Sequence, residues 1–404
     1  MQFIIQNFRW LITGALMAFA SCFGQTFFIS IFADDIMHSY DITNTEWGRI
    51  YGIGTFASGI LLLWAGGLAD RIAMLRIAPA VLMLLAVFAL LMAFNTSLVV
   101  LTFIIFGLRF AGQGMMMHIS MVAMARWFQA SRGRAVSLAL LGYTAGEAIL
   151  PLSFVFLLGL FSWQYLWIIP ALYALVLIPV LFLCLSTKRI PEGNSELIEQ
   201  TGMGDHHWTR AQALRHPLFW LLIPALITPS ITMTALFFQQ VNLTQEKGWA
   251  HLEFVALFPV FSVTTLCTMM VTGILVDRIG AARIMPIYQI PMAVGFLVLG
   301  IGGSITAALF AMILLGMMQG ANTTVVTTVM AENYGTRHVG AIKATSTAAI
   351  VFGSAISPSL TGYLIDQGRP FSTQLPLLSI LVFLTSGIAF LALRHYSRMR
   401  RRYT

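Results

Sequence analysis

The sequence predicts an all-α polytopic membrane protein with twelve transmembrane helices, built as two six-helix repeats. Composition is the first observation that predicts this class. Of the 404 residues, 58% are hydrophobic and only 9% are charged, whereas a soluble domain carries roughly a quarter charged residues. So few charges cannot coat a soluble surface, and so many apolar residues exclude an intrinsically disordered chain.

The length of the apolar stretches is the second observation. A bilayer core of ~30 Å is crossed by about 20 apolar residues in a helix, whereas the strands of a membrane barrel are about ten residues long and alternate in polarity. The chain therefore predicts spanning helices. Twelve spans are expected, at Trp10–Ala33, Trp47–Leu68, Ile77–Phe94, Leu98–Met124, Ala135–Leu160, Gln164–Leu185, Pro217–Phe238, Phe254–Val276, Ile284–Gly302, Ile305–Met330, Ala344–Ile365 and Leu375–Leu393.

The distribution of basic residues predicts the topology. Nineteen of the 23 Lys and Arg residues fall on one side of the predicted spans, and cytoplasmic loops are the ones that carry such an excess. We therefore expect both termini in the cytoplasm. Only Arg49, Lys247 and Arg369 fall on the outer side, and Arg109 lies within a span. Because topology explains the net charge of +8, we expect no nucleic-acid partner.

A polar interruption divides the chain. It predicts an N-terminal six-helix bundle at 1–185, a cytoplasmic linker at 186–216 and a C-terminal six-helix bundle at 217–404. The linker contains His206 and His207, but two adjacent histidines without further ligands are typical of a solvated loop. The three cysteines lie in apolar stretches and are odd in number, which does not indicate a disulfide framework. We expect no metal site.

The two halves of the chain are related by an internal repeat. Residues match at an offset of 206 to 207 positions in three separate regions, the loop after span two, span four and span five, which indicates duplication of a six-helix unit. Parallel repeats of this kind place a substrate site at their interface. The matches are Gly66–Arg71 with Gly273–Arg278, Gln113-Gly114 with Gln319-Gly320, Met124-Ala125 with Met330-Ala331, and Gly146–Pro151 with Gly353–Pro358.

Two motifs resemble those of the major facilitator superfamily. Gly273-x-x-x-Asp277-Arg278-x-Gly280-x-x-Arg283 is similar to its loop signature. Its partner in the first half has Ala73 near the place of the second glycine. Arg109-x-x-Gly112-Gln113-Gly114 is similar to the superfamily's second motif. With twelve spans and the repeat, the resemblance covers the whole chain and implies that fold and a transport function.

The paired loops predict a conformational latch. An aspartate at a helix end can meet helix N-terminal amides or a facing arginine in one conformation and lose them in another. Positive charge in short inner loops also serves topology, but that does not explain an aspartate at the same place in both halves. The predicted latch residues are Asp70, Arg71, Asp277, Arg278 and Arg283.

Two charged residues lie inside predicted spans, Arg109 and Glu147. Intramembrane charges cost about 2.5–3.5 kcal/mol on insertion scales and typically mark a substrate or proton pathway. We expect Arg109 to bind an anionic substrate and to take part in proton coupling, and Glu147 to carry the coupled proton. The alternative is a permanent Arg109–Glu147 ion pair that ties two helices. His118 falls on another face of the span than Arg109 and is expected to be a packed or pore-mouth residue.

Neutral polar residues supply the other predicted substrate contacts. Gln25 interrupts the first span beside Gly24, and a helical spacing of four would place Ser21 on the same face. In the tenth span Gln319, Asn322 and Thr323 are expected to contact substrate. Many Ser and Thr residues in membrane helices only bond their own backbone or pack against a neighbour.

The sequence has neither a phosphate-binding loop nor a catalytic constellation, and this narrows the classes of function that it can have. None of the three lysines follows a glycine, as a phosphate-binding loop requires, and we find no constellation typical of an enzyme. The sequence therefore predicts a secondary transporter that works by alternating access. Its energy source is expected to be the proton gradient, without a cofactor.

A resemblance to the monocarboxylate-porter-like branch narrows the substrate. The stretch Phe23-Gly24-Gln25-Thr26 and Gly142-x-x-x-Gly146 with Pro151 are similar to that branch, which implies proton-coupled transport of a small organic anion. Members commonly carry a basic residue in span eight, and this chain has none there. The alternative is a proton-coupled exporter of drug-like or siderophore-like molecules. We expect a small-molecule substrate, a monomer in the lipid bilayer and a bacterial inner-membrane location.

Overall fold

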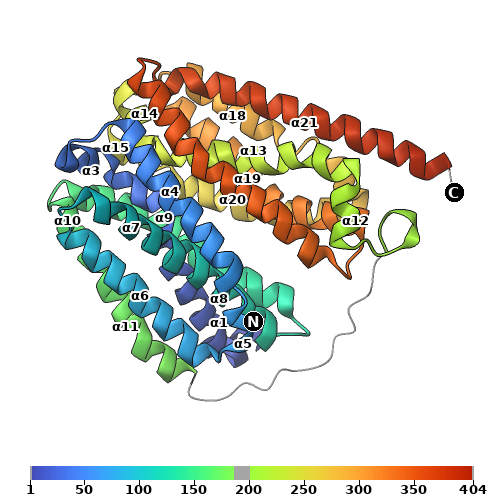
Figure 1. The fold of residues 1–404 in the computed structure, drawn as a ribbon, viewed down its shortest axis with the longest axis horizontal. Coiled ribbons are helices and arrows are strands. Elements are labelled where there is room, and N and C mark those ends of the chain that lie inside the picture. Colours follow the sequence, from blue (N-terminus) through green and yellow to red (C-terminus); the bar gives the residue numbers. More distant parts are fainter. Residues whose placement is uncertain (1, 186–200, 403–404) are drawn as a thin grey trace. The chain divides into compact units, whose positions relative to one another are not determined.

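The computed structural model describes residues 2–185 and 201–402, and the elements in these ranges are helices without a β-strand. Contacts between residues divide the chain into two compact units, Met1–Glu196 and Leu197–Thr404. Figure 1 shows the first unit from blue to green and the second from yellow-green to red.

The first unit contains fourteen helical segments among its described residues. They are α1 (Gln2–Ser21), η1 (Cys22–Gly24), α2 (Thr26–Ile29), η2 (Ser30–Phe32), α3 (Ala33–Tyr40), α4 (Asn44–Ala65), α5 (Leu68–Arg71), α6 (Met74–Phe94), α7 (Leu98–Leu108), η3 (Arg109–Met116), α8 (Met117–Trp127), α9 (Arg132–Leu158), α10 (Trp163–Leu166) and α11 (Ile168–Cys184).

The second unit contains eleven helical segments among its described residues. They are η4 (Met203–Asp205), α12 (Arg210–Arg215), α13 (Pro217–Phe238), α14 (Gln240–Lys247), α15 (His251–Val255), α16 (Phe258–Ile279), α17 (Ala281–Ile284), α18 (Ile290–Ile301), α19 (Ile305–Tyr334), α20 (Val339–Asp366) and α21 (Phe371–Arg402).

Ten helices in the described residues are long and apolar enough to cross a membrane. They coincide with ten of the predicted spans. The predicted second span corresponds to α4, which has 22 residues, and the ninth to the shorter α18, which has 12. The all-helical membrane class is confirmed, while the count of twelve spans and the cytoplasmic location of the termini stay predictions.

The same pairs of helices pack together in both units. In the first unit α1 packs against α9 and α11, α4 against α7 and η3, and α6 against α11. In the second unit α13 packs against α20 and α21, α16 against α19, and α18 against α21. These pairs occupy corresponding places in the internal repeat, so each half of the sequence folds by the same packing scheme.

Part of the predicted linker belongs to the second unit. Residues 186–200 lie outside the described ranges. After them, α12 packs against α13 and α20, and the His216 side chain accepts a hydrogen bond from the Leu218 amide at the start of α13. The ring of His206 stacks on Trp208, with centroids 4.9 Å apart. In the described residues no three His, Cys, Asp or Glu side chains gather in a way that could hold a metal ion.

Glycines allow the closest helix packing in the second unit. Gly316 and Gly320 lie one turn apart in α19 and face α16. A Cβ atom on Gly316 would lie 2.7 Å from the Phe261 carbonyl oxygen, and one on Gly320 would overlap the Thr265 carbonyl oxygen. Because lipid removes most of the hydrophobic drive between helices, small residues that permit such contact stabilise the pair.

Two charged residues on the predicted outer side, Glu246 and Lys247, cap the ends of helices. The carboxylate of Glu246 accepts hydrogen bonds from the first two amides of α21. The Lys247 ammonium donates to the carbonyl oxygens of Gly300 and Gly302 at the end of α18, at 2.7 and 2.9 Å. The first amides and the last carbonyls of a helix lack partners within the helix. The helix dipole favours a negative charge at the N-terminus and a positive charge at the C-terminus. These hydrogen bonds explain why Lys247 lies on the predicted outer side, away from most of the basic residues.

We predict that Gly320→Leu destabilises the protein, whereas Gly387→Leu does not. A side chain at residue 320 would force α16 and α19 apart, and overpacking costs about 1–3 kcal/mol or more. Gly387 in α21 is exposed, and a Cβ atom there would meet nothing within 4 Å. The melting temperatures of the two purified variants provide the measurement. Equal melting temperatures would contradict the role of the glycine contact.

Candidate functional site

The first predicted span is broken near its middle. After α1 and η1, Gln25 adopts an extended conformation with φ −84° and ψ 155°. The amides of Phe28 and Ile29 both donate to the Gln25 carbonyl, at 3.2 and 3.0 Å. A continuous helix would instead pair the Phe28 amide with Gly24. The break therefore leaves the Gly24 carbonyl oxygen available to another partner.

The fourth span approaches this break through a wide helical turn. Between α7 and α8, η3 is a π-helix, a form that is rare and often found at functional sites. Arg109 is its first residue, and only 2% of its surface is exposed. A Cβ atom on Gly112 would lie 2.7 Å from the Gly24 Cα atom. The two glycines thus let the backbones touch, which brings Arg109 within reach of Gly24.

Neutral oxygen atoms hold the Arg109 guanidinium. Its Nη1 donates to the Gly24 carbonyl oxygen at 3.1 Å and to Thr26 Oγ1 at 3.3 Å, and its Nε donates to Thr55 Oγ1 at 3.1 Å. The guanidinium carbon lies 5.2 Å from the centroid of the Tyr51 ring, within the range of a cation–π interaction. The Tyr51 hydroxyl in turn donates to Thr26 Oγ1 at 2.8 Å.

The hydrogen bonds to described residues leave one side of the guanidinium unoccupied. Its remaining nitrogen, Nη2, makes no hydrogen bond to any residue that the structure describes. The hydrogen bonds described for Arg109 go to Gly24, Thr26 and Thr55. Buried charges are normally paired. The Nη2 atom of Arg109 therefore has N–H donors that no described residue uses.

The second intramembrane charge lies on the neighbouring helix α9. Glu147 is 4% exposed and accepts a hydrogen bond from the Tyr143 hydroxyl at 3.4 Å. Tyr143 also contacts the break in the first span, because its carbonyl accepts from Cys22 Sγ at 3.5 Å and its ring lies 6.0 Å from that of Phe27. Arg109 and the Tyr143–Glu147 pair thus contact the same broken segment, Cys22–Phe27.

Gln25 lies at the centre of that break. Its side chain is half-buried and has no hydrogen-bond partner among the described residues. Ser21, in contrast, is fully buried and donates to the Ala18 carbonyl at 2.6 Å. The expected shared face of Ser21 and Gln25 is wrong, because it assumed a continuous helix where the backbone is extended.

The predicted polar residues of the second unit lie along α19. Asn322 Oδ1 accepts from the Tyr288 hydroxyl at 3.1 Å, and that hydroxyl accepts from Gln289 Nε2 at 2.8 Å. Gln319 is half-buried, Thr323 is exposed, and neither side chain has a partner among the described residues. Asn322 is therefore fixed in a hydrogen-bond network, whereas no described residue fixes Gln319 or Thr323.

The predicted latch residues lie at the ends of α5 and α16 and near α17. In the described structure Arg71, Asp277, Arg278 and Arg283 are exposed, and the last three make no hydrogen bond or ion pair. The backbone of Asp70 lies in α5, and its side chain lies outside the described part. No contact of these four exposed side chains tests the latch.

Another residue takes the helix amides that the latch hypothesis assigned to an aspartate. The carboxylate of Glu332, near the end of α19, accepts from the amides of Ala281 and Ala282 at 2.9 and 3.0 Å. These are the first two residues of α17. Asp277 does not make these contacts. A carboxylate does cap this helix, but it comes from a different span.

His118 has a packing role in the first unit. Its Nε2 lies 3.1 Å from the Gly66 carbonyl oxygen at the end of α4. This hydrogen bond joins α8 to the end of the second span and agrees with the packing interpretation of this histidine.

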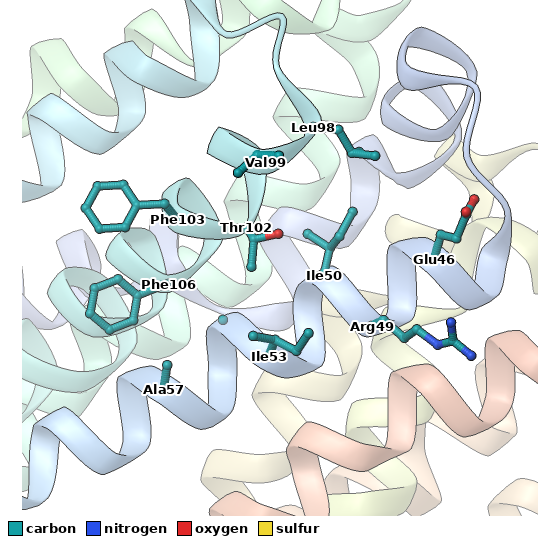
Figure 2. Close-up of a pocket in the computed structure, with 11 residues that line it drawn as sticks. Glu46, Arg49, Ile50, Ile53, Ala57, Leu98, Val99, Thr102, Phe103 and Phe106 are labelled. Carbon is teal, nitrogen blue, oxygen red and sulfur yellow. The ribbon is translucent and has the colours of Figure 1, made fainter.

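An apolar pocket of about 770 Å³ lies between α4 and α7, apart from these residues. Figure 2 shows Ile53 and Ala57 of α4 facing Phe103 and Phe106 of α7, with Glu46 and Arg49 at one end. The pocket is lined by none of the residues predicted for the site. Its wall suits an acyl chain or another lipophilic group.

Sequence reasoning missed the side chains that surround Arg109 and Glu147. These are Tyr51, Thr55, Thr26 and Tyr143. Tyr51 and Thr55 lie four residues apart and so share one face of the second span, a spacing that could have indicated them. Tyr143 lies four residues before Glu147 and offered the same signal.

The sequence of the chain matches one known protein family along most of its length. The model of the Major Facilitator Superfamily matches residues 14–358 and 230–402, which together span most of the chain. The chain belongs to the major facilitator superfamily. This membership identifies a multi-pass membrane transporter of small molecules that works by alternating access, and not an enzyme.

One curated relative and two solved structures show how similar the chain is to other proteins. The chain is 24% identical over 303 residues to the uncharacterized MFS-type transporter YhjX of Escherichia coli (strain K12), covering 72% of this chain and 71% of YhjX. Its fold is similar to crystal structures of a bacterial homologue of the human lysosomal transporter Spinster. The inward-facing, occupied form gives a TM-score of 0.72 at 15% identity, covering 95% of this chain and 96% of that one. The unoccupied form gives 0.69 at 16% identity, with coverage of 96% and 97%.

The repeat supplies a matched pair of variants that tests the role of Arg109. We predict that Arg109→Leu keeps the melting temperature at or above that of the wild type, since removing a buried charge relieves its desolvation cost. Leu315, the corresponding residue in the unbroken helix α19, is fully buried. Leu315→Arg is expected to cost about 2.5–3.5 kcal/mol. An equal loss of stability in both variants would make Arg109 a structural residue.

Proposed function

We propose that this superfamily member carries out proton-coupled transport of a small organic anion of the monocarboxylate type. The observation that carries the proposal is the buried Arg109 guanidinium, which is held by neutral oxygens and leaves Nη2 without a described partner. A carboxylate at Nη2 would form a charge-assisted hydrogen bond. Because burial weakens screening by water, this interaction favours an anion over a neutral analogue.

The cradle of Arg109 also favours a planar anionic group. Thr55, Thr26 and Gly24 fix the orientation of the guanidinium plane through three hydrogen bonds. A fixed fork loses little rotational freedom when substrate binds, and carboxylates match its geometry. Gln25 lies beside this cradle, and its side-chain amide has no partner in the described part of the chain. We assign Arg109 and Gln25 as the substrate contacts of the first unit.

The second unit is proposed to contribute neutral contacts. Gln319 and Thr323 present free polar groups, and Asn322 is oriented by Tyr288. Leu315 stands where the first unit has Arg109. Arg109 is therefore proposed to select an anion, and Gln319, Asn322 and Thr323 are proposed as neutral substrate contacts.

Glu147 is the proposed carrier of the coupled proton. It is a buried carboxylate, and its described hydrogen-bond donor Tyr143 contacts the same broken segment that holds Arg109. A substrate anion at Arg109 and a proton at Glu147 would together keep the net charge in this apolar region low. The proton gradient then supplies the energy, and no cofactor is needed.

Further proposals concern the organisation of the protein. We assign 1–185 and 217–404 as the two six-helix bundles, with 186–216 as the cytoplasmic linker. Asp70, Arg71, Asp277, Arg278 and Arg283 form the conformational latch. The relative from Escherichia coli supports a bacterial inner-membrane location, and we propose a monomer.

A second candidate function is proton-coupled export of drug-like or siderophore-like molecules. The apolar pocket between α4 and α7 favours it, since a volume of about 770 Å³ with an apolar wall suits a lipophilic molecule. In proteoliposomes, extrusion of lipophilic compounds without transport of any small acid would support the exporter over the anion transporter.

We predict that an inward-directed proton gradient drives uptake of labelled small monocarboxylates into proteoliposomes. Arg109→Gln should weaken the apparent affinity roughly 30-fold or more, because it removes a charge-assisted interaction of about 2 kcal/mol. Arg215→Gln, a change at an exposed arginine of α12, should leave uptake unchanged. Wild-type affinity in Arg109→Gln would exclude an anion site there.

We predict that Glu147→Gln separates substrate transport from proton movement. The amide keeps the shape and the contact with Tyr143 but carries no exchangeable acid proton. The variant should lose accumulation driven by a pH gradient while it retains exchange of labelled for unlabelled substrate. Accumulation at the wild-type level would show that Glu147 does not carry the proton.

A further inference from the structure

A tyrosine lies beside both charges of the candidate site in the first unit. Tyr143 precedes Glu147 by one turn of α9, and its hydroxyl donates to the Glu147 carboxylate at 3.4 Å. The same tyrosine interacts electrostatically with the Arg109 guanidinium. A change of charge at Glu147 can therefore alter what the Tyr143 hydroxyl offers to a ligand at Arg109.

Close packing of α9 against the first span fixes the position of Tyr143. A Cβ atom on Gly142 would overlap the Ala15 carbonyl oxygen of α1. One on Gly146 would lie 2.5 Å from Cys22 Sγ. Between these two glycines, the Tyr143 carbonyl accepts from Cys22 Sγ at 3.5 Å. The backbone of α9 therefore holds the tyrosine at the break in the first span.

The ring of Tyr143 contacts the segment that holds Arg109. Its centroid lies 6.0 Å from that of Phe27, in an edge-to-face arrangement, which is a favourable geometry for two aromatic rings. Phe27 follows Thr26, whose Oγ1 accepts from Arg109 Nη1 at 3.3 Å. Tyr143 thus connects the helix of Glu147 with the oxygens around the guanidinium.

The titratable groups that face Glu147 come from its own helix and from the break. They are the Tyr143 hydroxyl and the Cys22 thiol, and Tyr173 of α11 interacts with Cys22 in turn. Elements packed against α9 place their other titratable residues elsewhere: Arg9 and Tyr165 are exposed, His118 contacts Gly66 and Arg126 contacts Ala69. Glu147 is therefore the group whose protonation changes the charge beside Tyr143.

One hydroxyl proton cannot serve two acceptors at full strength. A tyrosine has a single O–H donor, and hydrogen bonds to an ionised carboxylate are about twice as strong as those between neutral groups. An ionised Glu147 therefore keeps the Tyr143 proton, whereas a protonated Glu147 is a weaker acceptor. The distance of 3.4 Å is long for an O–H···O hydrogen bond, so the hydroxyl loses little when it turns to another anion.

We propose that the Tyr143 hydroxyl alternates between the Glu147 carboxylate and the substrate anion at Arg109, so that a proton on Glu147 completes the substrate site. This inference rests on the proposed function. No covalent bond is exchanged apart from the proton itself: Glu147 takes it from water on the side where substrate enters, and Tyr143 retains its own. Proton and substrate then strengthen each other's binding, because coupling between two sites is reciprocal.

Equilibrium binding of labelled acetate, propionate and lactate to the purified full chain, measured over a series of pH values, tests the proposal. The affinity of the wild type should rise as the pH falls, because protonation of Glu147 releases the hydroxyl. Tyr143→Phe should lose about tenfold in affinity at the low end of the series, where the hydroxyl would bind the substrate, and nothing at the high end. A tyrosine with only a structural role would lower the affinity equally at both ends.

Tyr173→Phe is the matched control. Tyr173 packs on the first span through Phe19 and Phe23, and its hydroxyl donates to the Leu16 carbonyl at 3.1 Å. The control therefore also removes one hydrogen bond near the break, yet its binding profile should match that of the wild type. An equal loss in both tyrosine variants, a loss in Tyr143→Phe that does not depend on pH, or no loss at all would overturn the proposal.

Glu147→Gln keeps the test independent of how Tyr143→Phe folds. Its amide is a neutral acceptor at every pH, so the hydroxyl should be available throughout, and the affinity should stay at the level that the wild type reaches at low pH. An affinity that stays at the high-pH level of the wild type, or that still rises as the pH falls, would contradict the proposal.

The wild type separates this inference from the proposed function. If the wild type binds none of the labelled acids, the anion-transport function is wrong and the role of Tyr143 falls with it. If the wild type binds them with the expected pH dependence and Tyr143→Phe behaves identically, only the role of Tyr143 is wrong.

Discussion

The arrangement around the break in the first unit accommodates a buried cation, Arg109, which is held by neutral oxygen atoms. Arg109 needs acceptors, and regular helices offer few, because their carbonyls are already paired. The extended residue Gln25 frees the Gly24 carbonyl, and Gly24 and Gly112 let the two backbones touch. The break, the glycine contact and the threonines around Arg109 are therefore one arrangement that makes a positive charge tolerable inside apolar surroundings.

The sequence predicted the all-helical membrane class, because membrane helices are encoded by the length of apolar stretches, and it predicted the repeat, because residues match between the two halves. It also located Arg109 and Glu147, because a charge in an apolar stretch stands out. It did not reveal their partners. Thr26, Thr55 and Tyr51 are ordinary residues whose importance comes from the break at Gln25. A backbone that leaves the helix for one residue has no simple signal in a chain of apolar letters.

The described residues of the second unit show the same architecture without a buried charged side chain. Its α13 runs unbroken from Pro217 to Phe238, although it contains two internal prolines, and α19 is a continuous helix with Leu315 at the position of Arg109. Glycines there serve close packing with α16. The duplicated halves have thus diverged in chemistry while they keep the same pairs of neighbouring helices.

The π-helical turn η3 also explains a detail of the repeat. From Asp70 to Gln113 the first half contains one residue more than the second half from Asp277 to Gln319. A π-turn accommodates one additional residue per turn, and α19 has no such turn. The wide turn can therefore absorb a single-residue insertion locally, so that Met124 and Met330 return to corresponding positions. Arg109 begins the one segment of its span whose helical phase has been shifted.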